Sequence, residues 1–327
     1  MTLENYSSGL DKCEANFSAL TPISFLQRTA TVFPDYTSII SGQTSYTWQQ
    51  TYERCKMFAS ALLKIGITKG DNVSIIAPNT SAMYEAHFAI PMAGAVINTI
   101  NTRLDPRSIS YILEHSDSKL LLVDSEYIDV VTQAFKIGKH TLPVIYIEDS
   151  PDHKVYLQSY QSYDDFLAQG SANSESFEWQ LDDEWFPISL SYTSGTTGQP
   201  KGVVTHHRGA YLNALGNHLI WHMEKNPVYL WTLPMFHCNG WCFPWTIAAL
   251  AGTNICIRNV NANSILSAIN SNNVTYMCGA PVVVNMLIEA DIKVDKHIEI
   301  MTAAAPPPVS VLKKIQQLGF NIPMFTD

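Results

Sequence analysis

Short apolar runs alternate with helix-like stretches along most of the chain, and this alternation constrains the fold more than any other feature. The run VSIIA at 73–77 has the length of a buried strand, and the stretch from Ser81 to Met92 that follows it is helical in character. Further strands are predicted near 95–100, 120–123, 144–147, 187–192, 228–233, 253–257, 274–278 and 298–303. Helices fit near 47–65, 105–115, 206–222, 240–250, 262–271, 281–290 and 308–317. The pattern predicts an α/β fold with parallel sheets flanked by helices.

One segment interrupts the alternation. Residues 148–185 are rich in Ser, Asp, Gln and Tyr, and we interpret them as a surface excursion. Asp105 and Pro106 open the helix that ends near 115, as an N-cap followed by proline at the first helical position. In folds of this class, ligands bind beyond the carboxyl ends of the strands, so a site is expected at that edge.

Composition narrows the possible partners. The chain has 327 residues, of which 46% are hydrophobic and 15% charged, the balance of a globular protein. Its net charge is −9 and no basic stripe is visible, so nucleic acid is not an expected partner. An anionic ligand would need local cations and amide donors.

The chain also lacks the expected marks of membrane or secretory proteins. Its first residues carry no apolar stretch after a basic start, so we expect no signal peptide. The longest uncharged run, from Lys225 to Arg258, is broken by Pro and Gly, and we expect no transmembrane segment. The six cysteines are expected to be free thiols, and no metal site is predicted. These features favour a cytoplasmic location, with a peroxisomal one left open.

A loop rich in hydroxyls and glycines follows the strand PISLSYT. Glycines let the backbone turn and approach a ligand, hydroxyls and amide N–H groups donate to phosphate oxygens, and lysine adds a positive charge. The residues of this loop are Thr193, Ser194, Gly195, Thr196, Thr197, Gly198 and Lys201. Pro200 and Gly202 stand where a Walker A loop needs Gly and Ser or Thr, so the loop is not of that type. By composition alone, a phosphate-binding loop and a glycine-rich surface turn are equally supported.

The segment YTSGTTGQPKGVV at 192–204 resembles the signature of the AMP-forming adenylate superfamily. This group includes acyl-CoA synthetases, firefly-type luciferases and peptide-synthetase adenylation domains. The resemblance extends, in order, over segments at 45–55, 70–80, 92–104, 233–241 and 301–320. Two of these, MAGAVINTINTRL and LPMFHCNGW, are similar to acyl-CoA synthetase motifs.

The resemblance implies two half-reactions. A carboxylate attacks the α-phosphorus of ATP to give acyl-AMP and pyrophosphate, and the thiol of coenzyme A then takes the acyl group. It assigns the loop Thr193–Lys201 to the ATP phosphates, with Mg²⁺ accompanying ATP. Lys201 and His237 are the implied catalytic residues of this chain, and the main catalytic lysine is expected in a C-terminal part that the sequence does not contain.

The resemblance also implies a substrate pocket. Phe236, His237 and Trp241 would border the acyl group and the adenylate, although a structural role for His237 stays open. Trp241, Phe243 and Trp245 are read equally well as an acyl tunnel or as plain core. Ala303, Ala304, Ala305 and Pro306 would face the adenine and acyl side. Ala303 and Ala304 replace family glycines, which puts nucleotide affinity and acyl size in doubt.

We therefore interpret residues 1–327 as an incomplete N-terminal AMP-binding domain that lacks the C-terminal domain. Two interleaved lobes are expected, about 70–225 and about 20–69 plus 226–327. The predicted function is ATP-dependent acyl-CoA synthesis from a neutral, fatty-type acid. The alternatives are a non-catalytic nucleotide- or acyl-binding fragment, a subunit of a partner chain, and transfer to a different thiol. A homo-oligomer is a further possibility for its assembly.

Overall fold

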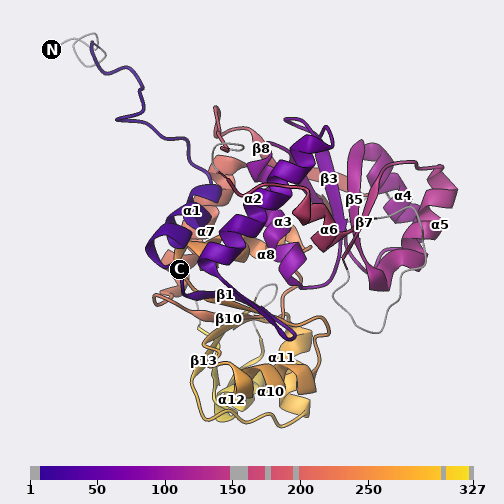
Figure 1. The fold of residues 1–327 in the computed structure, drawn as a ribbon. Helices are drawn as coiled ribbons and strands as arrows, with labels where there is room; N and C mark the ends of the chain where they lie inside the picture. The colour runs from indigo at the N-terminus through magenta and orange to yellow at the C-terminus, as the bar shows by residue number, and fades with distance from the viewer. Residues whose placement is uncertain (1–7, 148–160, 174–177, 194–198, 303–306, 324–327) are drawn as a thin grey trace.

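The computed structural model describes residues 8–147, 161–173, 178–193, 199–302 and 307–323. Within them, the strands form two seven-stranded sheets (Figure 1). Sheet A has the order β14-β13-β12-β10-β11-β1-β2, and sheet B has the order β7-β6-β5-β3-β4-β8-β9. The strands of sheet A are β1 (Thr37–Ser41), β2 (Thr44–Thr47), β10 (Val228–Trp231), β11 (Thr253–Cys256), β12 (Tyr276–Cys278), β13 (Ile298–Met301) and β14 (Phe320–Asn321). Those of sheet B are β3 (Asn72–Ile76), β4 (Val96–Thr99), β5 (Ser118–Asp124), β6 (Val144–Ile147), β7 (Gln161–Ser162), β8 (Pro187–Thr193) and β9 (Lys201–His206).

Helices cover both faces of each sheet. They are α1 (Ile23–Val32), α2 (Trp48–Lys64), α3 (Ser81–Met92), α4 (Pro106–His115), η2 (Ser125–Tyr127), α5 (Ile128–Gly138), α6 (Tyr163–Ala168), α7 (His207–Trp221), α8 (Cys238–Trp241), α9 (Phe243–Ala249), α10 (Ala262–Ser271), α11 (Pro281–Glu289) and α12 (Val309–Gln317). The α/β fold class is confirmed. Pairing is parallel except for two antiparallel pairs, β1 with β2 and β8 with β9, each at the edge of its sheet.

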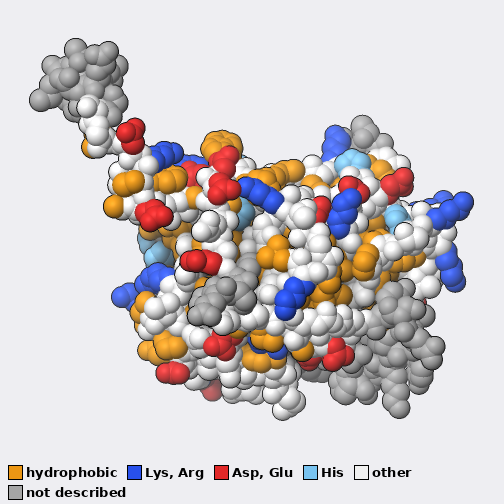
Figure 2. Space-filling model, turned by 45° about the horizontal axis from the view of Figure 1, so that its top comes forward, with side chains coloured by type: hydrophobic (Ala, Val, Ile, Leu, Met, Phe, Trp, Pro, Cys, Tyr) orange, Lys and Arg blue, Asp and Glu red, His pale blue; other side chains and the backbone are white. Residues whose placement is uncertain are grey.

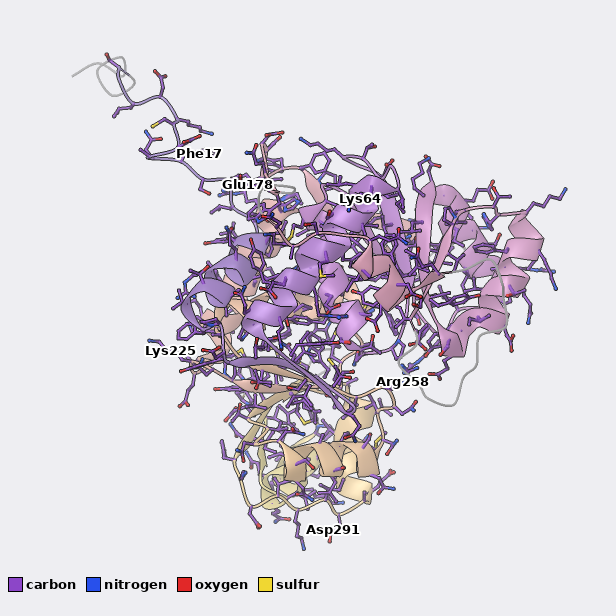
Figure 3. All side chains as sticks on the ribbon, in the orientation of Figure 1. Phe17, Lys64, Glu178, Lys225, Arg258 and Asp291 are labelled. Carbon is purple, nitrogen blue, oxygen red and sulfur yellow. The ribbon has the colours of Figure 1, made fainter. Side chains whose placement is uncertain are left out.

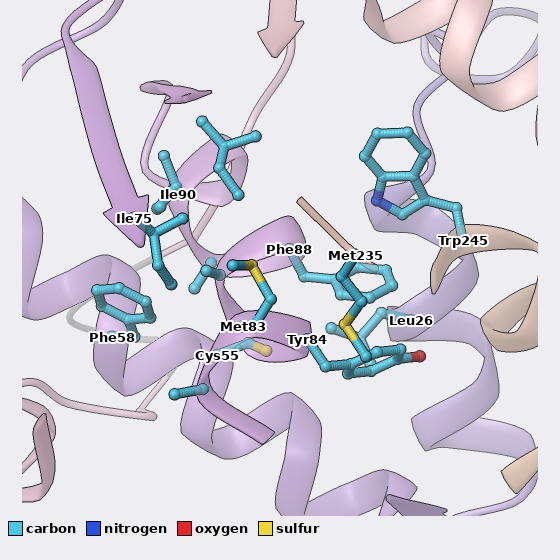
Figure 4. Close-up of a cluster of buried hydrophobic side chains, with 14 of the residues drawn as sticks. Leu26, Cys55, Phe58, Ile75, Met83, Tyr84, Phe88, Ile90, Met235 and Trp245 are labelled. Carbon is cyan, nitrogen blue, oxygen red and sulfur yellow. The ribbon is translucent and has the colours of Figure 1, made fainter. Parts of the chain in front are cut away.

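Three cores give the molecule its layers. The central core takes side chains from both sheets and from the helices between them, including α2, α3 and α9 (Figure 4). A second core lies between sheet A and α10, α11 and α12, and a third between sheet B and α4 and α5 (Figure 1). The strands of sheet B come from 72–206 and those of sheet A from 37–47 and 228–321. Because the central core is shared by both sheets, the boundaries of the two lobes stay a prediction.

Local capping explains where several helices begin. Asp105 accepts hydrogen bonds from the backbone N–H groups of Arg107 and Ser108 at 2.9 and 3.2 Å, which confirms the predicted N-cap. Thr47 and Gln50 form a capping box that starts α2. These caps satisfy amide donors that have no partner within the helix.

The expected surface excursion at 148–185 is wrong for residues 161–168. Its described part forms β7 and α6, with Tyr163, Phe166 and Leu167 buried. The rings of Tyr163 and Phe166 pack edge-on against the ring of Phe58 in α2. The Tyr163 hydroxyl donates to Glu85 at 2.6 Å. The segment is polar on average, so its three large side chains at helical spacing were overlooked. Tyr163, Phe166 and Leu167 pack the segment against the core.

The surface carries charges of both signs. Figure 2 shows acidic and basic side chains interspersed with apolar ones over the face that it presents. The described helices include none long and apolar enough to span a bilayer.

Candidate active site

A cavity of about 960 Å³ lies beyond the carboxyl ends of β4 and β8. Strand β9, helix α7, the segment 236–242 and part of α4 also contribute to its walls. Thr193, from the predicted phosphate loop, and Phe236, His237 and Trp241, from the predicted acyl pocket, all line it. Residues more than forty positions apart are therefore brought to one cavity, at the sheet edge where ligands of α/β proteins bind.

The predicted phosphate loop connects two strands of a hairpin. Thr193 ends β8, and Lys201, which begins β9, is its partner across the antiparallel pair. Ser194, Gly195, Thr196, Thr197 and Gly198 lie outside the described residues. Strand β9 was not predicted, because KGVVTH follows the glycine-rich loop without a clear apolar alternation. The hairpin places Lys201 beside the end of β8 that borders the cavity.

Tyr192 supports the hairpin from the side of α4. Its hydroxyl lies 2.8 Å from Nδ1 of His115, at the end of α4, and its ring meets that imidazole edge-on. Burial raises the pKa of Tyr192 to about 12, so its hydroxyl stays protonated at neutral pH. Tyr192 therefore anchors the strand as a neutral group.

Hydrogen bonds fix the segment that precedes the acyl-pocket residues. The amide of Asn79 donates to the carbonyls of Trp231 and Leu233 and accepts from the N–H of Met235 at 2.8 Å. The Thr99 hydroxyl donates to the carbonyl of Phe236 at 2.8 Å. Asn79 follows β3 and Thr99 ends β4, both in sheet B. Side chains from sheet B therefore position the loop that follows β10 of sheet A. Neither residue was predicted to act at the site.

The segment 238–242 is a left-handed turn, which corrects the predicted helix over 240–250. Cys238, Asn239, Gly240, Trp241 and Cys242 all have positive φ, between 48° and 66°. Only at Phe243 does the right-handed helix α9 begin, with Pro244 in its first turn. Left-handed backbone costs about 1–2 kcal/mol per residue other than glycine, and such strain gathers at functional sites.

The aromatic residues beyond this turn have separate roles. Phe243 and Trp245 are fully buried, Phe243 stacks on Tyr229, and the Trp245 indole donates to the carbonyl of His87 at 3.2 Å. They belong to the core, whereas Trp241 lines the cavity. Phe243 and Trp245 are therefore core residues, whereas contact of Trp241 with an acyl group stays a prediction.

Helix α7 contributes a wall that we did not predict. Gly209, Asn213 and Asn217 line the cavity and recur every four residues, so they share one helix face. Asn217 also donates to the carbonyl of Trp241 at 2.8 Å. The repeat of small and polar residues at this spacing could have indicated from the sequence that this helix face borders a ligand site.

Two residues that line the cavity each carry a buried polar atom that has no hydrogen-bond partner within the described part of the chain. These atoms are Oγ of Ser191 and Oδ1 of Asn239. The Nδ2 group of Asn239 donates to Oγ of Ser189 at 2.8 Å. Ser189 and Ser191 share one face of β8, so the three polar side chains gather below Thr193.

The remaining predicted site residues have fewer described contacts. Ala303, Ala304, Ala305 and Pro306 lie outside the described residues. His237 is exposed at the cavity, with Nε2 3.9 Å from Sγ of Cys238. The described residues contain no cluster of three or more His, Cys, Asp or Glu suited to a metal. A second cavity of about 530 Å³, lined by Arg103 and Arg258, shares Phe236 with the first.

The antiparallel pair of β8 and β9 thus lies at the edge of a mostly parallel sheet and borders a cavity that residues 236–242 also line. The family model of the AMP-binding enzymes matches residues 26–326, and the chain belongs to this family.

Among curated proteins, the chain is 46% identical over 333 residues to the peroxisomal acetate/butyrate–CoA ligase AAE7 of Arabidopsis thaliana. It is 47% identical over 332 residues to the peroxisomal trans-cinnamate:CoA ligase of Petunia hybrida. Each match covers 96% of this chain and 58% of the relative. The chain thus spans less than two thirds of the length of the relatives it matches.

Solved structures support the fold. The N-terminal domain of FACL13 from Mycobacterium tuberculosis superposes with a TM-score of 0.78 at 24% identity, over 93% of this chain and 74% of that one. The anthranilate CoA ligase AuaEII, in complex with anthranoyl-AMP, gives a TM-score of 0.80 at 20% identity, over 95% and 60% of the two chains.

Proposed function

We propose that this chain provides the phosphate-facing and acyl-binding part of an ATP-dependent acyl-CoA synthetase, an AMP-forming acid–thiol ligase. The observation that carries the proposal is the shared cavity, because one space is bordered by Thr193 of the glycine-rich hairpin and by Phe236, His237 and Trp241. A carboxylate and a polyphosphate could meet there. The names of the relatives, acetate/butyrate–CoA ligase and trans-cinnamate:CoA ligase, support this reaction class.

The chemistry divides between positioning and charge. In the first step, a carboxylate oxygen bonds to the α-phosphorus of ATP as the bond from that phosphorus to the pyrophosphate oxygen breaks. In the second, the thiolate of coenzyme A bonds to the acyl carbon and AMP leaves. We assign the β- and γ-phosphates to the loop from Thr193 to Lys201, whose amides, hydroxyls and one ammonium would stabilise the departing charge. Mg²⁺ would accompany ATP as its counter-ion.

His237 and Lys201 are assigned the catalytic roles. His237 is exposed at the cavity and would contact the adenylate side of the substrate. Lys201, at the start of β9, is the cation that ends the loop. Because the chain has a net charge of −9, a local cation is needed to hold a polyanion. Phe236 and Trp241 would enclose the acyl group, and Ala303–Pro306 the adenine side.

Calorimetry of the 327-residue chain with MgATP tests the nucleotide part of the proposal. We expect Lys201→Ala to weaken ATP binding by about tenfold, the effect of one charge-assisted contact. Lys225→Ala is the matched control, because Lys225 is exposed and lines neither described cavity (Figure 3). Equal binding by both variants would contradict the assignment of Lys201.

Pyrophosphate release tests the reaction. The chain and any longer in-frame protein are incubated with MgATP, coenzyme A and a panel of acetate, butyrate, cinnamate and benzoate. Acid-dependent pyrophosphate from the longer protein supports the ligase. Binding of ATP by both proteins without turnover by either would favour the alternative, a non-catalytic nucleotide- or acyl-binding unit.

Location and assembly are further proposals. The two relatives described above carry the word peroxisomal in their names, whereas the sequence alone favours the cytoplasm. Imaging of the tagged protein separates these two locations. A second copy of the chain and a C-terminal domain are the two alternative proposals for its assembly, and light scattering tests the homo-oligomer.

A further inference from the structure

The backbone carbonyl of Trp241 depends on a side chain from helix α7. Pro244, three residues further along the chain, has no N–H group, and the next two N–H groups donate to the carbonyl of Cys242 instead. The chain that follows the turn therefore leaves the Trp241 carbonyl to another donor. Nδ2 of Asn217 takes this place at 2.8 Å.

The amide of Asn217 is held in one orientation. A carbonyl oxygen only accepts hydrogen bonds, so the NH₂ group of Asn217, and not its oxygen, faces Trp241. The same NH₂ group lies 3.2 Å from Oγ1 of Thr246 in α9, which is fully buried and donates to the carbonyl of Ala214 at 3.0 Å. Asn217 thus joins α7 both to the end of the turn and to the helix that follows it.

This contact lies at the end of a strained segment. Four residues of the turn 238–242 other than glycine have positive φ, a conformation that persists only where the surrounding structure imposes it. The start of the segment is fixed independently, because Thr99 donates to the carbonyl of Phe236 at 2.8 Å. Loss of the Asn217 amide would therefore release the backbone of Trp241 and leave the start of the segment in place.

We propose that Asn217 is a positioning residue for the acyl group and acts through Trp241, which lines the cavity. This inference rests on the proposed ligase function and on the assignment of Trp241 to the acyl pocket. An aromatic ring offers a large apolar surface to a ligand. It contributes most to affinity when it is already held in place, because ordering it on binding costs conformational entropy.

Calorimetry of the 327-residue chain with two adenosine derivatives tests the proposal. One is 5′-O-(N-butanoylsulfamoyl)adenosine, a non-hydrolysable acyl-adenylate mimic, and the other is 5′-O-sulfamoyladenosine, which lacks the acyl group. The ratio of the two affinities isolates the acyl contribution. We expect the unsubstituted chain to prefer the butanoyl mimic by about tenfold and Asn217→Ala to lower this preference to about twofold. The affinity for 5′-O-sulfamoyladenosine should not change.

Two further variants separate this effect from a loss of stability. Asn217→Asp keeps the shape of the side chain but cannot donate to the Trp241 carbonyl, so it should give the same loss and serves if Asn217→Ala does not fold. Asn272→Ala is the matched control and should keep the full preference. Nδ2 of Asn272 also donates to a backbone carbonyl, that of Ala268 at 3.1 Å, but Asn272 lines neither the active-site cavity nor the one that shares Phe236 with it. A preference that survives both Asn217 variants overturns the proposal and leaves the ligase function intact.

A double-mutant cycle tests whether Asn217 acts through Trp241, because Asn217 itself also lines the cavity. In a Trp241→Ala background, Asn217→Ala should cause no further loss of preference. A loss as large as in the unsubstituted chain would mean that Asn217 contacts the ligand directly, and would refute the positioning role. If the unsubstituted chain binds neither compound, the proposed function fails together with this inference. If it binds both equally, the acyl-pocket assignment and this inference fail, whereas nucleotide binding stands.

Discussion

The guanidinium of Arg258 donates two hydrogen bonds to the carboxylate of Asp124, from Nη1 to Oδ2 at 2.9 Å and from Nη2 to Oδ1 at 2.7 Å. Asp124 ends β5 in sheet B, and Arg258, which Figure 3 labels, follows β11 in sheet A. The pair therefore connects the carboxyl edges of the two sheets. Nη2 also lies 3.1 Å from Glu126. The Asp124 side chain is fully buried and that of Arg258 is 21% exposed, so this contact is formed largely away from water.

Removing Arg258 leaves a buried carboxylate without its main partner. We expect Arg258→Met to lower the free energy of unfolding by about 3–5 kcal/mol, the usual cost of breaking a buried pair. Urea denaturation measures this change. Lys119→Met is the control, because Lys119 pairs with exposed Asp117 and its loss should not be measurable. Similar effects of the two substitutions would show that Arg258 is not a strut between the sheets.

Two histidines should make the fold sensitive to acid. Burial lowers the pKa of His87 and of His207 from 6.5 to about 4, so both are neutral in the native state at pH 6. The unfolded chain binds protons at these sites below pH 6.5, so unfolding is favoured as the pH falls. Stability is full above pH 6.5 and should fall by about 3 kcal/mol per histidine down to pH 4.

The test is the slope of unfolding free energy against pH. His87→Leu should flatten that slope between pH 6.5 and 4, whatever it does to stability at pH 8, because the substituted side chain cannot bind a proton. A slope identical to that of the unsubstituted protein would mean that His87 does not contribute.

Two glycines offer a matched pair of alanine substitutions. Gly240 has φ of 55° and no room for a Cβ beside Trp231, so Gly240→Ala should destabilise the protein by about 2–4 kcal/mol. Gly216 lies within α7, where a Cβ would meet nothing within 4 Å, so Gly216→Ala should stabilise by about 0.5–1 kcal/mol. Thermal unfolding reports both. If the two substitutions change stability in the same direction, the left-handed turn is not as described.

Alkylation of cysteines tests the cavity without an activity assay. Cys13 and Cys238 are exposed and the other four cysteines are buried. Burial raises the pKa of Cys242 to about 11, so little of its thiolate exists at neutral pH. Iodoacetamide should therefore modify Cys13 and Cys238 in the folded chain. An acyl-adenylate mimic should protect Cys238, which lines the cavity, and leave Cys13 reactive, as mass spectrometry would detect. Equal protection of both would place the ligand elsewhere.

Many elements followed from local patterns of the sequence. The run 73–77 and the helix from Ser81 to Met92 lie where the apolar pattern placed them, because a buried strand and a buried helix need continuous apolar residues. The N-cap at Asp105 was equally visible, since capping is decided within four residues. Helix α6 was missed because its anchors, Tyr163, Phe166 and Leu167, stand in a polar segment. Helices α1 and α5 and strands β1, β2, β9 and β14 were missed as well.

The sequence by itself determined the α/β class, the family and the two segments, at 192–204 and 233–241, that border the cavity. Each of these depends on residue types at short spacing. Only the tertiary structure decided that Thr193 and His237 share one cavity, that Gly209, Asn213 and Asn217 line it, and that Asn239 donates to Ser189 of β8. Such relations depend on how two sheets pack through a common helix layer and on a left-handed turn pressed against Trp231. Contacts between distant segments set both, and no local pattern encodes them.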